Sequence, residues 1–134
     1  MRFEIAADTD RGIVKETNQD SLLVKCFSTC KGDMAFAVLC DGMGGLSGGE
    51  RASALAAQGM TQHLLENAQA TDISTEMGRA ALRLNEKVKD IRDSENRKIE
   101  AGTTLTAVFI RNGELFWCGI GDSHIYLYLS LIHI

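Results

Sequence analysis

Residues 34–45 read Met-Ala-Phe-Ala-Val-Leu-Cys-Asp-Gly-Met-Gly-Gly, and this stretch decides the fold. Its first seven residues form a continuous apolar run, which is typical of a buried β-strand. The run stops abruptly at Asp41-Gly42, a dipeptide that in most proteins only shapes a turn. Here the acid ends the most apolar strand of the chain. The stretch therefore predicts a central strand with the Asp41 carboxylate at its C-terminal end.

The segments around this strand predict separate runs of strands and helices. Ser47 and Glu50 have the spacing of a capping box at the start of a helix, and Asn112-Gly113 is a strong type I′ hairpin signal. Periodicity predicts helices after Ser47 and over 73–91, and strands over 3–7, 21–27, 34–40, 104–110, 115–120 and 125–129. Segregated strands and helices favour an α+β fold with antiparallel sheets.

Composition excludes several classes of protein. The chain has 134 residues, 45% of them hydrophobic and 24% charged, as in one globular domain. Its net charge of −4 argues against a general nucleic-acid-binding protein, which would need a positively charged surface. No apolar run approaches the roughly 20 residues of a membrane span, and Glu4 interrupts any secretory leader. The four cysteines lack zinc-finger spacing and are interpreted as free thiols of a reducing cytoplasm.

Three carboxylates lie at predicted strand ends. Asp20 precedes one strand, Asp41 follows another, and Asp122 lies in a Gly-Asp-Ser turn. Carboxylates that converge repel one another unless a cation neutralises them, and Mg²⁺ and Mn²⁺ prefer such hard oxygen ligands. Gly42 would let a backbone carbonyl approach the same ion. Each acid alone is more simply a turn residue, so only their convergence would indicate a metal site.

Three ordered motifs resemble the N-terminal part of a bacterial PPM-type (type 2C) metal-dependent protein serine/threonine phosphatase. The motifs are Thr9-Asp10-Arg11-Gly12 through Asn18-Gln19-Asp20-Ser21, then residues 38–45 with Gly49-Glu50-Arg51-Ala52-Ser53, then residues 102–107 with 119–126. The resemblance implies a four-layer αββα sandwich of two antiparallel sheets flanked by helices, of which this chain supplies an incomplete part. It also implies a catalytic activity, the hydrolysis of phosphoserine and phosphothreonine in proteins.

The resemblance also implies roles for individual residues. Asp41 corresponds to a carboxylate that bridges two metal ions, and Gly42 to the neighbour whose carbonyl completes one metal shell. Asp20 corresponds to an acid that holds a metal-bound water, and Asp122 to a ligand of an additional ion. The complete domain would thus hold two or three Mn²⁺ or Mg²⁺ ions. Lys15 lies where the family usually has a phosphate-binding arginine, and loses the planar guanidinium fork while keeping the charge.

Two further departures from the family pattern concern the site and the length of the chain. Gln19 lies where many members have a glutamate. The family domain continues about as far again, with two more aspartates, so we expect residues 1–128 to be the N-terminal part of the domain. Residues 129–134 resemble translated sequencing adapter and are interpreted as a non-native tail. We therefore expect a truncated and inactive fragment.

The resemblance implies phosphorylated protein partners, made by a bacterial Ser/Thr kinase, and a cytoplasmic monomer without nucleic acid. Two alternatives stay open. One is a non-catalytic regulatory protein with the phosphatase fold. The other is an ATPase domain with an Asp-x-Gly-x-Gly nucleotide loop, which would need an asparagine-bearing helix before Asp41, where the sequence predicts strands.

Overall fold

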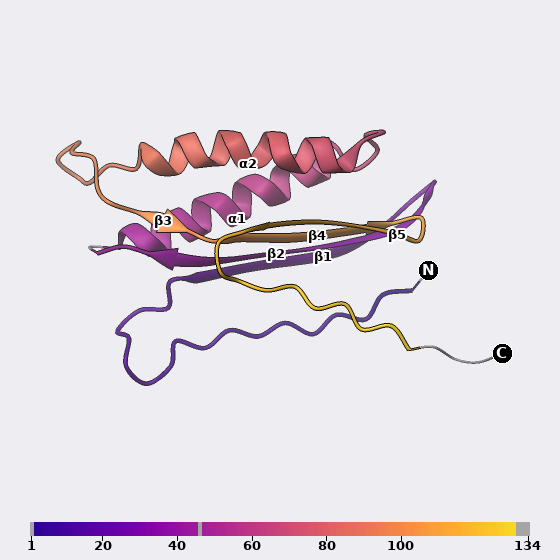
Figure 1. Ribbon diagram of the computed structural model, residues 1–134, viewed down its shortest axis with the longest axis horizontal. Coiled ribbons are helices and arrows are strands. Elements are labelled where there is room, and N and C mark those ends of the chain that lie inside the picture. The colour runs from indigo at the N-terminus through magenta and orange to yellow at the C-terminus, as the bar shows by residue number, and fades with distance from the viewer. Residues whose placement is uncertain (1, 46, 131–134) are drawn as a thin grey trace.

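A single antiparallel sheet with two helices on one face makes up the computed structural model, which describes residues 2–45 and 47–130 (Figure 1). The elements follow the order β1 (Asp20–Thr29), β2 (Gly32–Met43), α1 (Gly48–Glu66), α2 (Ile73–Lys89), β3 (Gly102–Thr103), β4 (Leu105–Arg111) and β5 (Glu114–Ile120). This is the predicted α+β class with an antiparallel sheet. Among the described residues it comprises one sheet layer and one helix layer.

Strand β2 holds the sheet together. The strand order is β1-β2-β4-β5, with β3 pairing the end of β2, and every pairing is antiparallel. The apolar run 34–40 supplies the middle of β2, as its composition predicts, and Met34, Val38 and Cys40 are fully buried. Asn112 and Gly113 both have positive φ, as a type I′ turn between β4 and β5 requires.

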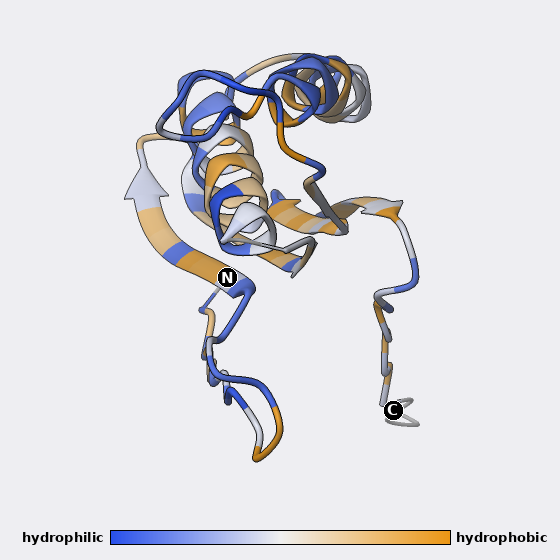
Figure 2. Cartoon of the chain, turned by 90° about the vertical axis from the view of Figure 1, so that its left-hand side faces the viewer, coloured by the Kyte–Doolittle hydropathy of each residue, from blue (hydrophilic) through white to orange (hydrophobic). Residues whose placement is uncertain are grey.

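The core lies between the helices and the upper face of the sheet. Figure 2 shows the two helices above the sheet, and the buried residues of α1 include Ala52, Ala56 and Met60. Gly59 of α1 packs against Leu84 of α2, and a Cβ at Gly59 would come within 2.3 Å of the leucine Cδ2. His63 Nε2 also lies 2.9 Å from Glu76 Oε2, which ties the two helices together. The fully buried side chains include Met60, Leu64, Ile73 and Phe109.

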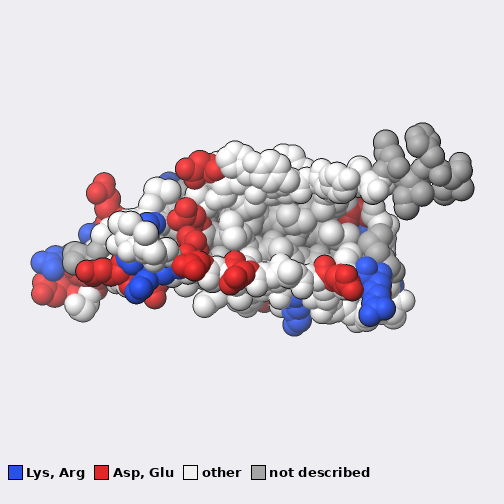
Figure 3. All heavy atoms as spheres, turned by 90° about the horizontal axis from the view of Figure 1, so that it is seen from below, with Lys and Arg blue, Asp and Glu red and all other residues white. Residues whose placement is uncertain are grey.

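The lower face of the sheet is only partly covered. Residues 3–8 and 123–127 run beneath it, below its opposite edges (Figures 1 and 2). A groove of about 390 Å³ separates the N-terminal segment from the sheet. Trp117 is 66% exposed on this face, which Figure 3 shows as a broad uncharged surface.

The strands predicted at 3–7 and 125–129 are therefore wrong for this structure. Both segments are irregular, and Tyr126 and Tyr128 are almost fully exposed. Alternation in residues 3–7 and β-prone side chains in residues 125–129 favour extended segments, but a strand forms only when a neighbour completes its hydrogen bonds. Neither segment pairs with a strand in the described part of the chain. Of the predicted tail, residues 131–134 lie outside the described residues.

The capping box predicted at the start of α1 is also absent. Ser47 occupies the N-cap position with φ 61° and ψ 9°, and its side chain makes no capping hydrogen bond. A capping serine needs extended backbone, whereas the glycine-rich turn before α1 holds Ser47 in the left-handed region. The amide of Gly48 instead bonds the Gly45 carbonyl at 2.9 Å.

None of the helices in the described ranges, 2–45 and 47–130, is both long and apolar enough to cross a membrane.

Ser47 provides a test of this helix start. Ser47→Gly should raise the free energy of unfolding by about 0.5–1 kcal/mol, because glycine relieves the left-handed backbone. Ser47→Ala should leave it nearly unchanged, since alanine has the same strain and no capping bond is lost. Chemical denaturation of the three proteins measures both values. A capping box would instead make Ser47→Ala cost about 1 kcal/mol.

Candidate functional site

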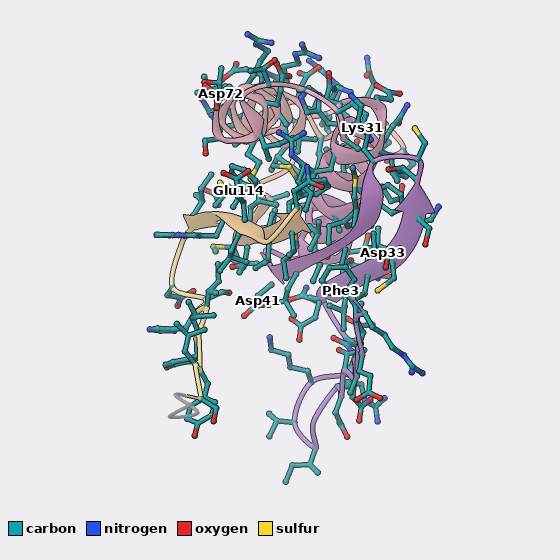
Figure 4. The ribbon with its side chains drawn as sticks, turned by 90° about the vertical axis from the view of Figure 1, so that its right-hand side faces the viewer. Phe3, Lys31, Asp33, Asp41, Asp72 and Glu114 are labelled. Carbon is teal, nitrogen blue, oxygen red and sulfur yellow. The ribbon has the colours of Figure 1, made fainter. Side chains whose placement is uncertain are left out.

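Two carboxylates face each other at one end of the sheet. The β1–β2 register places Asp20 directly opposite Asp41. Residues in such a pair point to the same face, with Cβ atoms about 4.5–5.5 Å apart. The alternation along β2 buries Cys40 on the helix side and turns Asp41 to the lower face, where Figure 4 shows it. The sequence prediction that these two acids lie together is thus matched by the structure.

The two carboxylates, Asp20 and Asp41, repel each other. Asp20 keeps contact with solvent, yet partial desolvation and the facing Asp41 carboxylate raise the pKa of Asp20 above its ordinary value. Lys15 acts in the opposite direction and lowers the same pKa. A positive charge between the two acids would remove their repulsion.

Lys15 and the two acids line one pocket. The pocket has a volume of about 260 Å³, and its lining combines residues 10–15 with Asn18, Gln19, Asp20 and Asp41. The loop that brings Lys15 here is held by its own polar contacts, including Gly12 N to Asp10 Oδ1 at 2.6 Å and Asn18 Nδ2 to Thr9 Oγ1 at 2.8 Å. Lys15, Asp20 and Asp41 therefore share a polar, solvent-accessible cavity, whose lining also includes Asp10 and Arg11.

Gly42 lies where no other residue fits. A Cβ at this position would come within 2.1 Å of the Gly49 carbonyl oxygen and 2.6 Å of the Gln19 carbonyl oxygen. The Gly42 amide donates to that Gln19 carbonyl at 3.0 Å. The beginning of α1 and the end of β2 therefore touch backbone to backbone beside Asp41. The sequence predicted that Gly42 brings its carbonyl close to a metal ion; the close contacts seen here are with protein backbone, so that role stays a prediction.

Gln19 joins the two sides of the pocket. Its carbonyl accepts from Gly42, and its side-chain Nε2 donates to the Gly44 carbonyl at 3.1 Å. A carboxylate could not make the second bond, because it has no hydrogen to donate. Gln19 thus connects the glycine-rich loop to the start of β1. The sequence showed only that Gln19 replaces a glutamate common in the family, and did not suggest this role.

Asp122 does not line this pocket. It lies exposed in the turn after β5, and β4 separates β5 from β2 in the sheet. A polar connection nevertheless links that turn to Asp41, through Thr104 and Ser123. In the part of the chain that the structure describes, no three His, Cys, Asp or Glu side chains lie close enough to hold a metal. The expected convergence is therefore seen for Asp20 and Asp41 alone.

The available donors still fit a hard divalent cation. Asp20 and Asp41 offer anionic oxygens on one face, and Gly42 adds a backbone carbonyl next to them in the chain. Mg²⁺ takes one or two protein carboxylates and keeps several waters, so two acids in an open pocket suit it. No exposed cysteine or histidine lines the pocket, which disfavours a softer metal.

Comparison with known proteins places this geometry in a family. The sequence model described as Protein phosphatase 2C matches residues 11–130. Serine/threonine protein phosphatase PstP of Mycobacterium tuberculosis, strains CDC 1551 and H37Rv, is 32% identical over 122 residues. That alignment covers 91% of this chain and 22% of PstP, so the chain spans less than a quarter of these relatives.

Solved structures agree with the sequence match. The crystal structure of PstP from M. tuberculosis gives a TM-score of 0.69 at 32% identity, covering 87% of this chain and 46% of that one. The PstP catalytic domain in complex with two manganese ions gives 0.68, covering 87% and 47%. A PPM Ser-Thr phosphatase from Mycobacterium smegmatis, in complex with cacodylate, gives 0.58 at 29% identity, covering 87% and 44%. The chain belongs to the protein phosphatase 2C family, with the partial antiparallel fold of its bacterial Ser/Thr phosphatases.

Proposed function

We propose that the protein hydrolyses phosphoserine and phosphothreonine esters in proteins, with Mn²⁺ or Mg²⁺ as its cofactor. The observation that carries this proposal is the pocket in which Lys15 lies beside the facing carboxylates Asp20 and Asp41. The manganese-bound PstP structure supports the choice of metal. Substrates made by a bacterial Ser/Thr kinase, a cytoplasmic location and a monomeric state belong to the same proposal.

Each pocket residue has one task in this proposal. Asp41, in the middle strand, and Gly42 would hold the metal, with Asp20 on the same face and Asp122 at an additional ion. Bound divalent ions would supply activation of water and neutralisation of phosphate charge. Lys15 would attract and orient the phosphate as a point charge, with less directional grip than an arginine. The exposed loop 10–15 leaves room for a protein substrate.

The two alternatives fit the structure less well. A nucleotide-binding ATPase domain needs a helix with an asparagine before the glycine-rich loop, whereas β1 and β2 precede it within the described residues. A non-catalytic regulator keeps the fold but needs no phosphate-binding cation. The pairing of Lys15 with two carboxylates in one cavity favours the enzyme over the regulator.

Metal dependence is the first test. The native protein that contains this sequence should cleave p-nitrophenyl phosphate and phosphothreonine peptides only when Mn²⁺ or Mg²⁺ is added. The reason is that the pocket offers oxygen donors and no cysteine nucleophile. Steady-state assays with and without EDTA measure this. Full activity in excess EDTA would contradict the proposal.

Asp41 is the most sensitive position. Asp41→Asn in that protein should lower kcat at least about 10³-fold, roughly 4 kcal/mol, because Asp41 would contact both metal ions. Glu114→Gln, an exposed acid at the start of β5, is the matched control and should keep full activity. A loss below tenfold for Asp41→Asn would show that its role is misassigned.

Lys15 should act mainly on substrate binding. Lys15→Ala should raise KM with little change in kcat, while Lys15→Arg should keep or lower KM, because the guanidinium also binds phosphate. Lys31→Ala, in the turn between β1 and β2, controls for loss of a surface charge. If both Lys15 variants behave like the wild type, Lys15 is only a solvated charge.

The donor set also bears on residues 1–134 expressed alone. Asp20 and Asp41 face each other in the pocket, and no third acid lies close enough within the described residues to complete a metal-holding group, which leaves a second ion with few protein ligands. We therefore propose that this chain by itself is inactive. Metal-dependent turnover by residues 1–134 at the rate of the native protein would overturn this part of the proposal.

A further inference from the structure

The backbone of Asp41 is held from the β3–β4 side by a pair of threonines. Its amide donates to Thr104 Oγ1 at 2.9 Å, and its carbonyl accepts from the Thr104 amide at 2.9 Å. Thr103 Oγ1 donates to the same carbonyl at 3.1 Å. Both polar backbone groups of Asp41 are therefore bound by residues more than 60 positions away along the chain.

The position of Thr104 explains this arrangement. The pairs Leu39 with Thr106 and Gly42 with Thr103 place Thr104 opposite Asp41, at the break between β3 and β4. Asp41 thus lies between Asp20 on one side and Thr104 on the other. At this break the threonine hydroxyl, instead of a backbone carbonyl, accepts the Asp41 amide.

The same hydroxyl reaches the turn that carries Asp122. Thr104 Oγ1 lies 2.9 Å from Ser123 Oγ. A hydroxyl has one hydrogen and two lone pairs, so Thr104 can accept from Asp41 and donate to Ser123 at once. Gly121 packs on Thr104 as well: it has φ +100°, and a Cβ there would come within 2.8 Å of Thr104 Cγ2. Thr104 itself is 2% exposed, so water does not compete for these bonds.

We propose that Thr104 is a positioning residue whose hydroxyl locks the backbone of Asp41 to the turn that carries Asp122. The connection joins two acids that the sheet order keeps apart, across the intervening strand β4. This proposal rests on the proposed function, in which Asp41 and Asp122 serve as metal ligands. The hydroxyl touches neither metal nor substrate, so its effect would pass through the aspartates alone.

The chain offers a matched control two residues along. Thr106 is also buried, at 6% exposure, but its Oγ1 has no hydrogen-bond partner within the described residues. Thr104→Val and Thr106→Val therefore make the same chemical change in the same segment. Only the first leaves a backbone donor without its acceptor. Thr104→Ser keeps the hydroxyl and removes a methyl group.

The direct readout is hydrogen exchange at the Asp41 amide, measured by NMR on the 134-residue chain without metal. Thr104→Val should accelerate this exchange about tenfold, Thr104→Ser should restore it to within about threefold, and Thr106→Val should leave it unchanged. Unchanged exchange in Thr104→Val, or equal acceleration in Thr106→Val, would overturn the proposal.

A second variant keeps the test decisive if Thr104→Val does not fold. Ser123→Ala breaks the link at its other, half-exposed end and should accelerate exchange of the Asp41 amide several-fold, because Thr104 loses the partner that orients its hydroxyl. Where both variants fold, their effects on that amide should not add, because they break one connection. Exchange at Asp41 that does not respond to Ser123→Ala would contradict the link.

Mn²⁺ titration then separates this inference from the proposed function. If Asp41 binds the metal, Thr104→Val should weaken Mn²⁺ affinity about tenfold, and Thr104→Ser should restore it, while Thr106→Val has no effect. Loss of affinity in Thr104→Val that serine does not rescue would count against positioning by the hydroxyl. A wild-type chain that binds no Mn²⁺ would refute the proposed metal site, and the exchange results would still decide the role of Thr104.

Discussion

The repulsion between Asp20 and Asp41 is the constraint on which the rest of this end of the molecule depends. Two neighbouring antiparallel strands place these carboxylates opposite each other on one face. Partial desolvation and the facing Asp41 carboxylate raise the pKa of Asp20, so holding both acids ionised costs free energy. The surrounding structure holds the pair in place: Gln19 and Gly42 on one side, the two threonines on the other.

Most of the fold could be predicted because it depends on local pattern. The run 34–40 is apolar throughout because β2 lies in the middle of the sheet and under the helices, and Asn112-Gly113 specifies its turn by backbone conformation alone. Residues 3–7 alternate as real strands do, and residues 125–129 are apolar and β-prone. Periodicity reports which face of a segment is apolar, and says nothing of whether a second strand lies alongside, so these two predictions failed.

The residues of the candidate site also differ in whether the sequence could place them. Asp20 and Asp41 could be paired from the sequence because a short hairpin joins their strands. Asp122 could not be placed, since its distance from Asp41 depends on the order of strands in the sheet. Ser47 was misread because the spacing of a capping box is visible in sequence, while a left-handed backbone is not. Thr104 lies in the motif 102–107, but the sequence could not specify its role, because a threonine that packs and a threonine that binds a distant amide look identical.

The two sides of the Asp41 site differ in how far apart their residues lie in the chain. The Asp20–Asp41 pair closes a hairpin with a two-residue turn, whereas the Asp41–Thr104 contact spans 63 positions and encloses both helices. Contacts between near neighbours form early and distant ones late, because a longer loop costs more entropy to close. We therefore expect the two acids to meet first, before the threonines fix the backbone of Asp41. During that interval the hairpin keeps its register through the apolar pairs further along, such as Leu23 with Val38, since a slip by one residue would turn Asp41 toward the helices.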